Sequence, residues 1–247
     1  MSDPFLLALV TITFFAAGTV KGVIGMGLPT VAMGVLGALI SPLAAASLLI
    51  VPSLATNLWQ FLAGTATRAL VRRLWPMMLA ILIGTMLGSG WLARGDTAAT
   101  TTALGIALIV YAAYTLLAPQ RHVPARAELW LSPLTGFLTG IITGTTGIFV
   151  IPAVPYLQAL GLSRDDLIQA LGLSFTVSTV ALAIGLGLHD AFALDRFGLS
   201  VLALAPALAG MWAGGMLRRK IAPATFRKIF LVSLLLLGAE MSYRAFA

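Results

Sequence analysis

One lysine lies well inside an apolar stretch of this sequence, where its charge could hold an anion. Lys21 stands in a glycine-rich segment that runs from Gly18 to Pro29. An ammonium group inside a membrane is costly and usually has a partner or a function. Every aspartate and glutamate lies in a loop or at the end of an apolar block, so a bound anion is the partner that we expect. The alternative is that Lys21 snorkels to the membrane surface.

Hydroxyl and amide side chains in two other apolar blocks could donate hydrogen bonds to the same anion. Helices that begin near Gly27 and Gly147 would also direct free N–H groups toward it. Serine and threonine in membrane helices often bond the carbonyl four residues earlier, so a structural role is the alternative for each hydroxyl. The candidate substrate-binding residues are Lys21, Gly25, Gly27, Thr56, Asn57, Thr143, Gly144, Gly147, Ser174, Ser178 and Thr179.

The sequence contains no recognisable catalytic motif. His122 and His189 lie in or beside loops, the chain has no cysteine, and neither a His-Glu-x-x-His nor a Gly-x-Ser-x-Gly pattern occurs. A phosphate-binding Gly-x-x-x-x-Gly-Lys-Ser/Thr loop is also absent, which excludes ATP drive within this chain. We therefore expect no catalytic residue, no metal site and no cofactor.

The elements that must position these residues are membrane helices. The chain has 247 residues, of which 60% are hydrophobic and only 9% are charged, too apolar a composition for a soluble protein. The apolar blocks mostly approach the roughly 20 residues that a helix needs to cross a bilayer. They cover residues 5–24, 28–40, 42–63, 74–93, 98–118, 129–146, 148–160, 167–188, 197–217 and 224–243. The predicted fold class is an all-α polytopic membrane protein.

The net charge of +7 does not indicate nucleic-acid binding, because the basic residues other than Lys21 lie in loops or near block ends, as membrane topology requires. The N-terminus carries no basic region, so we expect no cleaved signal peptide. Membrane lipid and a small anionic substrate are the expected partners. The oligomeric state is left open.

Glycine and proline interrupt the helices at defined places. Gly25 and Gly27 end the first helix, and Pro29 suits the first turn of the next one. That next block, 28–40, is short for a crossing, so it is either a re-entrant half-helix or a tilted span. Pro52 removes a backbone donor and should free a carbonyl near mid-membrane. Three small-residue patterns could instead serve helix packing alone, namely Gly18-x-x-x-Gly22, Gly84-x-x-x-Gly88 and Gly136-x-x-x-Gly140-x-x-x-Gly144.

The second half of the chain repeats the first. A shift of 122 residues superposes the glycines at 18, 22 and 25 on those at 140, 144 and 147. With the same shift Ser41 meets Ser163, where each begins a helix, and Asn57 meets Thr179. We therefore expect a first transmembrane repeat at 1–118, a cytoplasmic linker at 119–128 and a second repeat at 129–247.

The distribution of lysine and arginine predicts how the repeats are threaded. If each glycine-broken helix pair enters and leaves by one face, nine basic residues collect on one side of the membrane and three on the other. If each pair makes one crossing, the same twelve divide seven and five. The first threading agrees better with the excess of basic residues in cytoplasmic loops. It makes the two repeats inverted, each with a broken pair followed by three spanning helices, and places both termini outside the cytoplasm.

The glycine-rich segment from Gly18 to Pro29, its repeat from Gly140 to Pro152, and the helices opening at Ser41 and Ser163 resemble the TauE/SafE family of membrane transporters. The resemblance extends over essentially the whole chain. It implies transport of small anions such as sulfite, sulfonates or sulfur-containing organic acids.

Inverted repeats with interrupted helices are a construction that secondary transporters use. We therefore expect a secondary transporter of a small sulfur-containing or organic anion in a bacterial inner membrane, with its site between the repeats. The alternative is a membrane scaffold or assembly factor, in which Lys21, Asn57 and the threonines of the apolar blocks would have no role.

Overall fold

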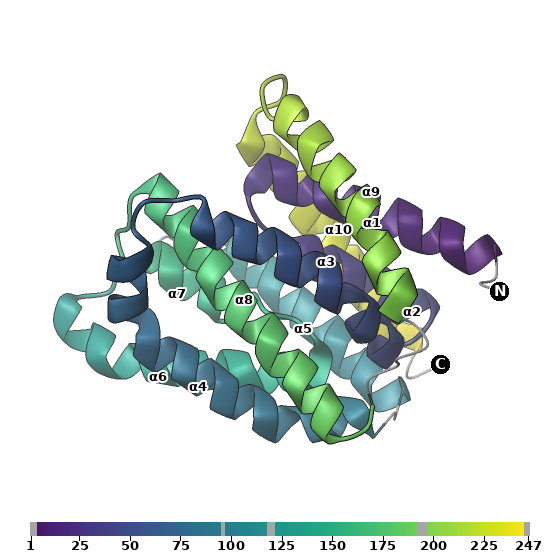
Figure 1. Ribbon diagram of the computed structural model, residues 1–247, viewed down its shortest axis with the longest axis horizontal. Coiled ribbons are helices and arrows are strands. Elements are labelled where there is room, and N and C mark those ends of the chain that lie inside the picture. The colour runs from purple at the N-terminus through teal and green to yellow at the C-terminus, as the bar shows by residue number, and fades with distance from the viewer. Residues whose placement is uncertain (1–3, 95–96, 118–121, 192–196, 245–247) are drawn as a thin grey trace. The chain divides into compact units, whose positions relative to one another are not determined.

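The computed structural model describes residues 4–94, 97–117, 122–191 and 197–244. Within these ranges the regular structure is entirely helical (Figure 1), which confirms the all-α prediction. Gly95, Asp96 and residues 119–121, which the sequence places in loops, lie outside the described residues, as do Asp195 and Arg196. The helices are α1 (Pro4–Ile24), α2 (Leu28–Leu39), α3 (Pro42–Leu62), α4 (Thr67–Ala93), α5 (Thr97–Leu117), α6 (Ala125–Thr146), α7 (Ala153–Ala159), α8 (Arg164–Leu188), α9 (Phe197–Leu217) and α10 (Pro223–Arg244).

Six of these helices, α1, α3, α4, α5, α8 and α9, are long and apolar enough to cross a membrane. All five tryptophans are exposed, as expected of anchors at a membrane surface: Trp59, Trp75, Trp91, Trp130 and Trp212. The structure therefore fits a polytopic membrane protein.

The first glycine break has the predicted form. Gly25 and Gly27 have φ angles of 81° and 106°, a left-handed conformation that favours glycine. Pro29 lies in the first turn of α2, which extends for 12 residues. The chain thus turns sharply between α1 and α2 at the two positions that lack a side chain.

The second break differs from the prediction. Gly147 is left-handed, with φ 72°, but no helix begins beside it, and α7 has only seven residues. Thr143 and Thr146 hold the intervening backbone in a non-helical form, because the Thr143 hydroxyl donates to the Ile148 carbonyl at 3.0 Å and the Ile148 N–H donates to the Thr146 hydroxyl at 3.2 Å. The expected helix N-terminus near Gly147 is therefore wrong.

The helices predicted to open at Ser41 and Ser163 do so with the same cap. The Ser163 hydroxyl accepts the N–H of Asp166 at 3.1 Å, and the Ser41 hydroxyl accepts the N–H of Ala44 at 3.2 Å. Each cap satisfies one of the N–H groups that a helix leaves unpaired at its first turn. By contrast, α6 begins at Ala125, within the segment assigned to the linker, because Pro124 is extended and residues 125–128 form the first turn.

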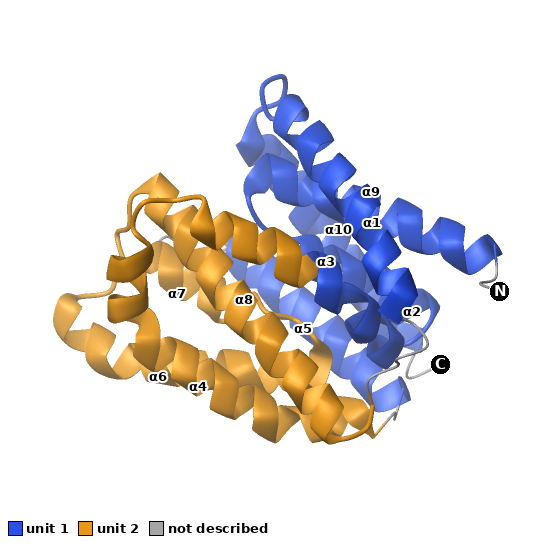
Figure 2. Ribbon diagram, in the orientation of Figure 1, with its two compact units in different colours: residues 1–52, 97–116, 193–247 blue, residues 53–96, 117–192 orange. Residues whose placement is uncertain are grey.

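Two compact units divide the chain (Figure 2). Unit 1 comprises Met1–Pro52, Thr97–Leu116 and Ala193–Ala247, and unit 2 comprises Ser53–Asp96 and Leu117–Phe192. The chain passes from unit 1 to unit 2 inside α3, at Pro52. Each unit contains helices from both halves of the sequence, so the units are not the 122-residue repeats, and the division into repeats stays a prediction.

Glycines bring pairs of helices into backbone contact within each unit. In unit 1, a Cβ at Gly18 would clash with the Ala207 carbonyl of α9, and one at Gly210 would clash with the Phe15 carbonyl of α1. In unit 2, Gly140 meets α4 at Ile81 in the same way. All three small-residue patterns therefore serve close helix packing.

In unit 2, helices α4 and α8 run in the same direction, while α3 and α8 run in opposite directions. Gln169 bonds Thr67 at 2.8 Å near the start of α4, and Gly185 lies against Ser89 near its end. Between α3 and α8, Gln60 donates to the Ile168 carbonyl and Ser53 bonds Thr179.

In the pair of α6 and α7, the start of α6 lies beside the end of α7. Val123, just before α6, donates to the carbonyl of Ala159 at the end of α7 over 2.9 Å. Gly161 lies against His122 at the same place. The chain therefore enters and leaves this broken pair on one side.

Unit 1 has the same kinds of pairing. Gly105 lies against Ser242 while Ile109 lies against Gly238, so α5 and α10 run in opposite directions. Gly34 of α2 lies against both Leu108 and Leu237, between those two helices.

Candidate functional site

The predicted site residues divide between the two units. Lys21, Gly25 and Gly27 belong to unit 1, at the break between α1 and α2. The other eight belong to unit 2, on α3, at the end of α6 and on α8: Thr56, Asn57, Thr143, Gly144, Gly147, Ser174, Ser178 and Thr179.

The break in unit 1 combines three features that suit an anion. Lys21, in the last turn of α1, has only 2% of its surface exposed. Gly27 ends the break and directs the N-terminus of α2 toward it, where first-turn N–H groups lack partners within the helix. Thr30, in that first turn, is fully buried, and within the described residues its hydroxyl has no hydrogen-bond partner.

A chain of hydrogen bonds runs across α3 and α8 in unit 2. The Asn57 amide donates to the Ser53 hydroxyl at 2.9 Å, and that hydroxyl lies 3.0 Å from the Thr179 hydroxyl. Thr179 donates in turn to the Phe175 carbonyl at 2.7 Å. Because a carbonyl can only accept, the Thr179 proton is committed to Phe175 and Ser53 must donate to Thr179. The hydrogen bonds therefore all donate in one direction, from the Asn57 amide to the Phe175 carbonyl.

Two serines on α8 have hydroxyls that take no part in this series of hydrogen bonds. Ser174 and Ser178 are four residues apart, which places them on one face of the helix, and both are fully buried. Neither hydroxyl bonds any described residue. The same is true of Thr85 on α4, a helix that packs against α8. A buried hydroxyl without a partner costs about 1–3 kcal/mol, so these three groups have donor capacity that the described contacts leave unused.

Other predicted residues have local structural contacts. The Thr143 hydroxyl donates to Ile148, and Thr56 donates to the Ser53 carbonyl at 3.3 Å. Gly144 packs against the backbone of Thr85 on α4, and Gly147 provides the left-handed turn after α6. For these four positions the contacts agree with the structural alternative.

Sequence reasoning missed four polar residues. Thr30, Ser53 and Thr85 are described above, and the fourth is Ser200 of α9. Pro52 cannot donate to the Leu48 carbonyl as a helical residue would, and the Ser200 hydroxyl donates to that carbonyl instead, at 2.8 Å. The proline predicted a freed carbonyl, but nothing in the sequence indicated which residue would bond it.

Within the ranges that the structure describes, no group of three or more His, Asp or Glu residues gathers in a way that could hold a metal ion.

Comparison with protein families decides the identity of the chain. A sequence model of the family described as Sulfite exporter TauE/SafE matches residues 10–241. The chain belongs to the sulfite exporter TauE/SafE family. Membership confirms the resemblance seen in the glycine-rich segments and indicates a membrane transporter of sulfite or related anions. A transporter family also supports the expectation that the chain is not an enzyme. Neither the curated proteins nor the solved structures contained a match.

Proposed function

We propose that this TauE/SafE protein is a secondary transporter that moves a small sulfur-containing or organic anion across the cytoplasmic membrane. Its substrate site is formed where the two 122-residue repeats meet, and both termini lie outside the cytoplasm.

The observation that carries this proposal is the polar cluster of unit 2. Ser53 and Asn57 come from the first predicted repeat and Thr179 comes from the second, so the Ser53–Thr179 hydrogen bond joins the repeats. Ser174 and Ser178 lie beside them on α8 with unused, buried hydroxyls. Sites of this kind, at the interface of two repeats, are typical of secondary transporters.

The directions of the helices support inverted repeats. The 122-residue shift makes α3 the counterpart of α8 and α5 the counterpart of α10. Inversion requires counterparts to point in opposite directions, and each of these two pairs is antiparallel within its own unit. The same-side entry and exit of the α6–α7 pair also supports the threading that collects basic residues on the cytoplasmic face.

The chemistry of the buried groups supports an anion. Sulfite and sulfonates present oxygen atoms that accept hydrogen bonds, so their site must supply donors. Lys21, the first turn of α2 and the serine hydroxyls are donors, and the aspartates and glutamates among the described residues lie in loops or near helix ends. Within unit 1 we propose Lys21 as a cationic anion-binding group. Within unit 2 we propose Ser174 and Ser178 as hydroxyl donors, with Ser53 and Thr179 holding α8 in position.

Anion flux into proteoliposomes tests the function, with a panel of sulfite, sulfonates, sulfate and small carboxylates. We expect saturable flux of at least one of these anions, and its loss in Lys21→Met. Lys228→Met is the matched control, because it makes the same chemical change at an exposed position of α10. Folded protein that moves none of the anions would refute the transporter proposal and favour a scaffold, whereas normal flux in Lys21→Met would reduce Lys21 to an anchor.

A further inference from the structure

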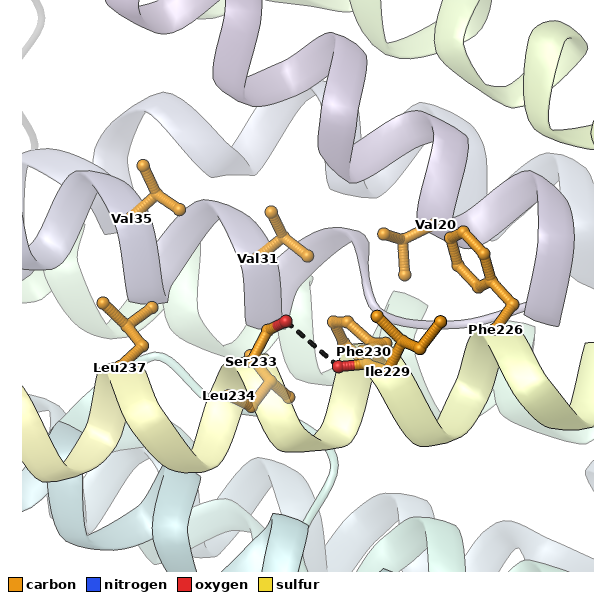
Figure 3. Close-up of a pocket in the computed structure, with 9 residues that line it drawn as sticks. All are labelled: Val20, Val31, Val35, Phe226, Ile229, Phe230, Ser233, Leu234 and Leu237. Atoms are coloured by element: carbon orange, nitrogen blue, oxygen red, sulfur yellow. Dashed lines mark hydrogen bonds between the residues drawn. The ribbon is translucent and has the colours of Figure 1, made fainter.

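An apolar groove of about 270 Å³ lies on unit 1 between α2 and α10, with one side closed by α1. Figure 3 shows side chains of α2 and α10 facing one another across it. Eight of its nine lining residues are apolar: Val20, Val31, Val35, Phe226, Ile229, Phe230, Leu234 and Leu237. The ninth, Ser233, donates its hydroxyl proton to the Ile229 carbonyl at 3.0 Å. The groove thus suits a hydrocarbon chain.

The length of the groove matches one leaflet of a bilayer. Its lining residues on α10 run from Phe226 to Leu237, a rise of about 17 Å in a helix at 1.5 Å per residue. Half of a hydrocarbon core of about 30 Å is nearly the same length. Past Leu237 the apolar surface continues over Ala38 and Leu39 of α2 and reaches the ion pair of Glu240 and Arg244 in the last turns of α10. An acyl chain from a single leaflet would fill the groove from Phe226 to Leu237.

Basic side chains gather at the other end of the groove. Arg218, Arg219 and Lys220 form the turn between α9 and α10 and are exposed. Arg227 and Lys228 follow in the first turns of α10, beside Phe226, and no acidic residue lies between 218 and 228. A phosphate group at this end would therefore meet an uncompensated positive charge.

We propose that this groove binds one anionic phospholipid, with an acyl chain between α2 and α10 and the phosphate beside Arg218, Arg219 and Lys220. Charge complementarity distinguishes this site from ordinary lipid contact. A zwitterionic lipid of the same chain length would fill the groove equally well, but only an anionic lipid would neutralise the positive charge of the turn. The turn carries the basic residues that mark a cytoplasmic loop, and anionic lipids are abundant in that leaflet. The proposal does not depend on the transported anion.

Native mass spectrometry of the purified full-length chain tests the site. Palmitoyl-oleoyl phosphatidylglycerol and phosphatidylcholine, which share their acyl chains, are titrated separately into the detergent-solubilised protein. We expect the first phosphatidylglycerol to bind at least tenfold more tightly. The triple variant Arg218→Gln, Arg219→Gln, Lys220→Gln should lose this preference, because each charge removed should lower the affinity for phosphatidylglycerol by about fivefold. Ser233→Phe, which fills the groove, should weaken the first binding event for both lipids.

Control variants separate the site from general effects of charge and bulk. Arg68→Gln with Arg72→Gln removes exposed charge from α4, and Leu202→Phe adds bulk to an exposed position of α9, so neither should change the first binding event. Arg218→Lys with Arg219→Lys keeps the charge and should keep the preference. Equal binding of the two lipids by the wild type, a preference that survives the triple variant, or an unchanged first binding event in Ser233→Phe would overturn the proposal.

Discussion

Replacing Ser178 by alanine should affect stability and substrate affinity in opposite directions. The hydroxyl is fully buried and bonds no described residue, so its removal relieves a desolvation cost that amounts to about 1–3 kcal/mol for such a group. We expect the free energy of unfolding to stay level or to rise by up to about 1 kcal/mol. A hydrogen bond to a charged ligand contributes about 1.5–3 kcal/mol, so KM for the transported anion should rise by about tenfold to 150-fold.

Thr179→Val is the matched control, because it changes the next residue of the same helix. It removes the donor to Phe175 and leaves the Ser53 hydroxyl without its acceptor. Here we expect a loss of stability, about 1–3 kcal/mol, since a buried donor becomes unpaired.

Two measurements on each variant decide the matter. Flux into proteoliposomes at increasing anion concentration gives KM, and thermal unfolding in detergent gives the change in stability. Ser174→Ala, on the same face of α8, should behave as Ser178→Ala does. A wild-type KM in both serine variants would refute a role for these hydroxyls in anion binding, and a marked loss of stability in either variant would make that serine a structural residue.

Two further predictions concern topology and the proline in α3. Reporter fusions should place residue 122 in the cytoplasm and residue 247 outside, and finding both on one side would contradict inverted repeats. Ser200→Ala should cost about 1–3 kcal/mol of stability, because the Leu48 carbonyl loses its donor. In a Pro52→Ala background, where residue 52 can donate again, thermal unfolding should show a smaller cost, and an equal cost in both backgrounds would disprove the link.

Much of the fold could be predicted because it depends on local chemistry. Composition and block length determine that the chain forms membrane helices, because a helix satisfies its backbone groups within one segment and needs about 20 apolar residues to cross a bilayer. The start of α2 after Gly27 and the caps at Ser41 and Ser163 follow from the backbone and hydrogen-bonding properties of single residues. The same local reasoning failed at Gly147, where two threonine side chains compete for the backbone that a helix would have used.

The candidate site was only partly predictable. Sequence singled out Lys21, Ser174 and Ser178 by residue type and by position inside apolar blocks. It could not rank the hydroxyls, because Thr179 looks the same as Ser178 in the sequence. Only the packing of α3 against α8 reveals that Thr179 is bonded to Ser53, 126 residues away, and that Ser178 is not.

The sequence by itself therefore determined the family, the helical membrane class and the places where helices break. Tertiary structure decided which helices pair, which carbonyl Ser200 bonds and which hydroxyls stay available for a ligand. The physical reason is that a hydrogen bond requires its donor and acceptor within about 3 Å. Between helices far apart in the chain, that distance depends on the rotation and register of each helix. Close contacts at glycines establish this rotation and register, and they form only when the helices pack together.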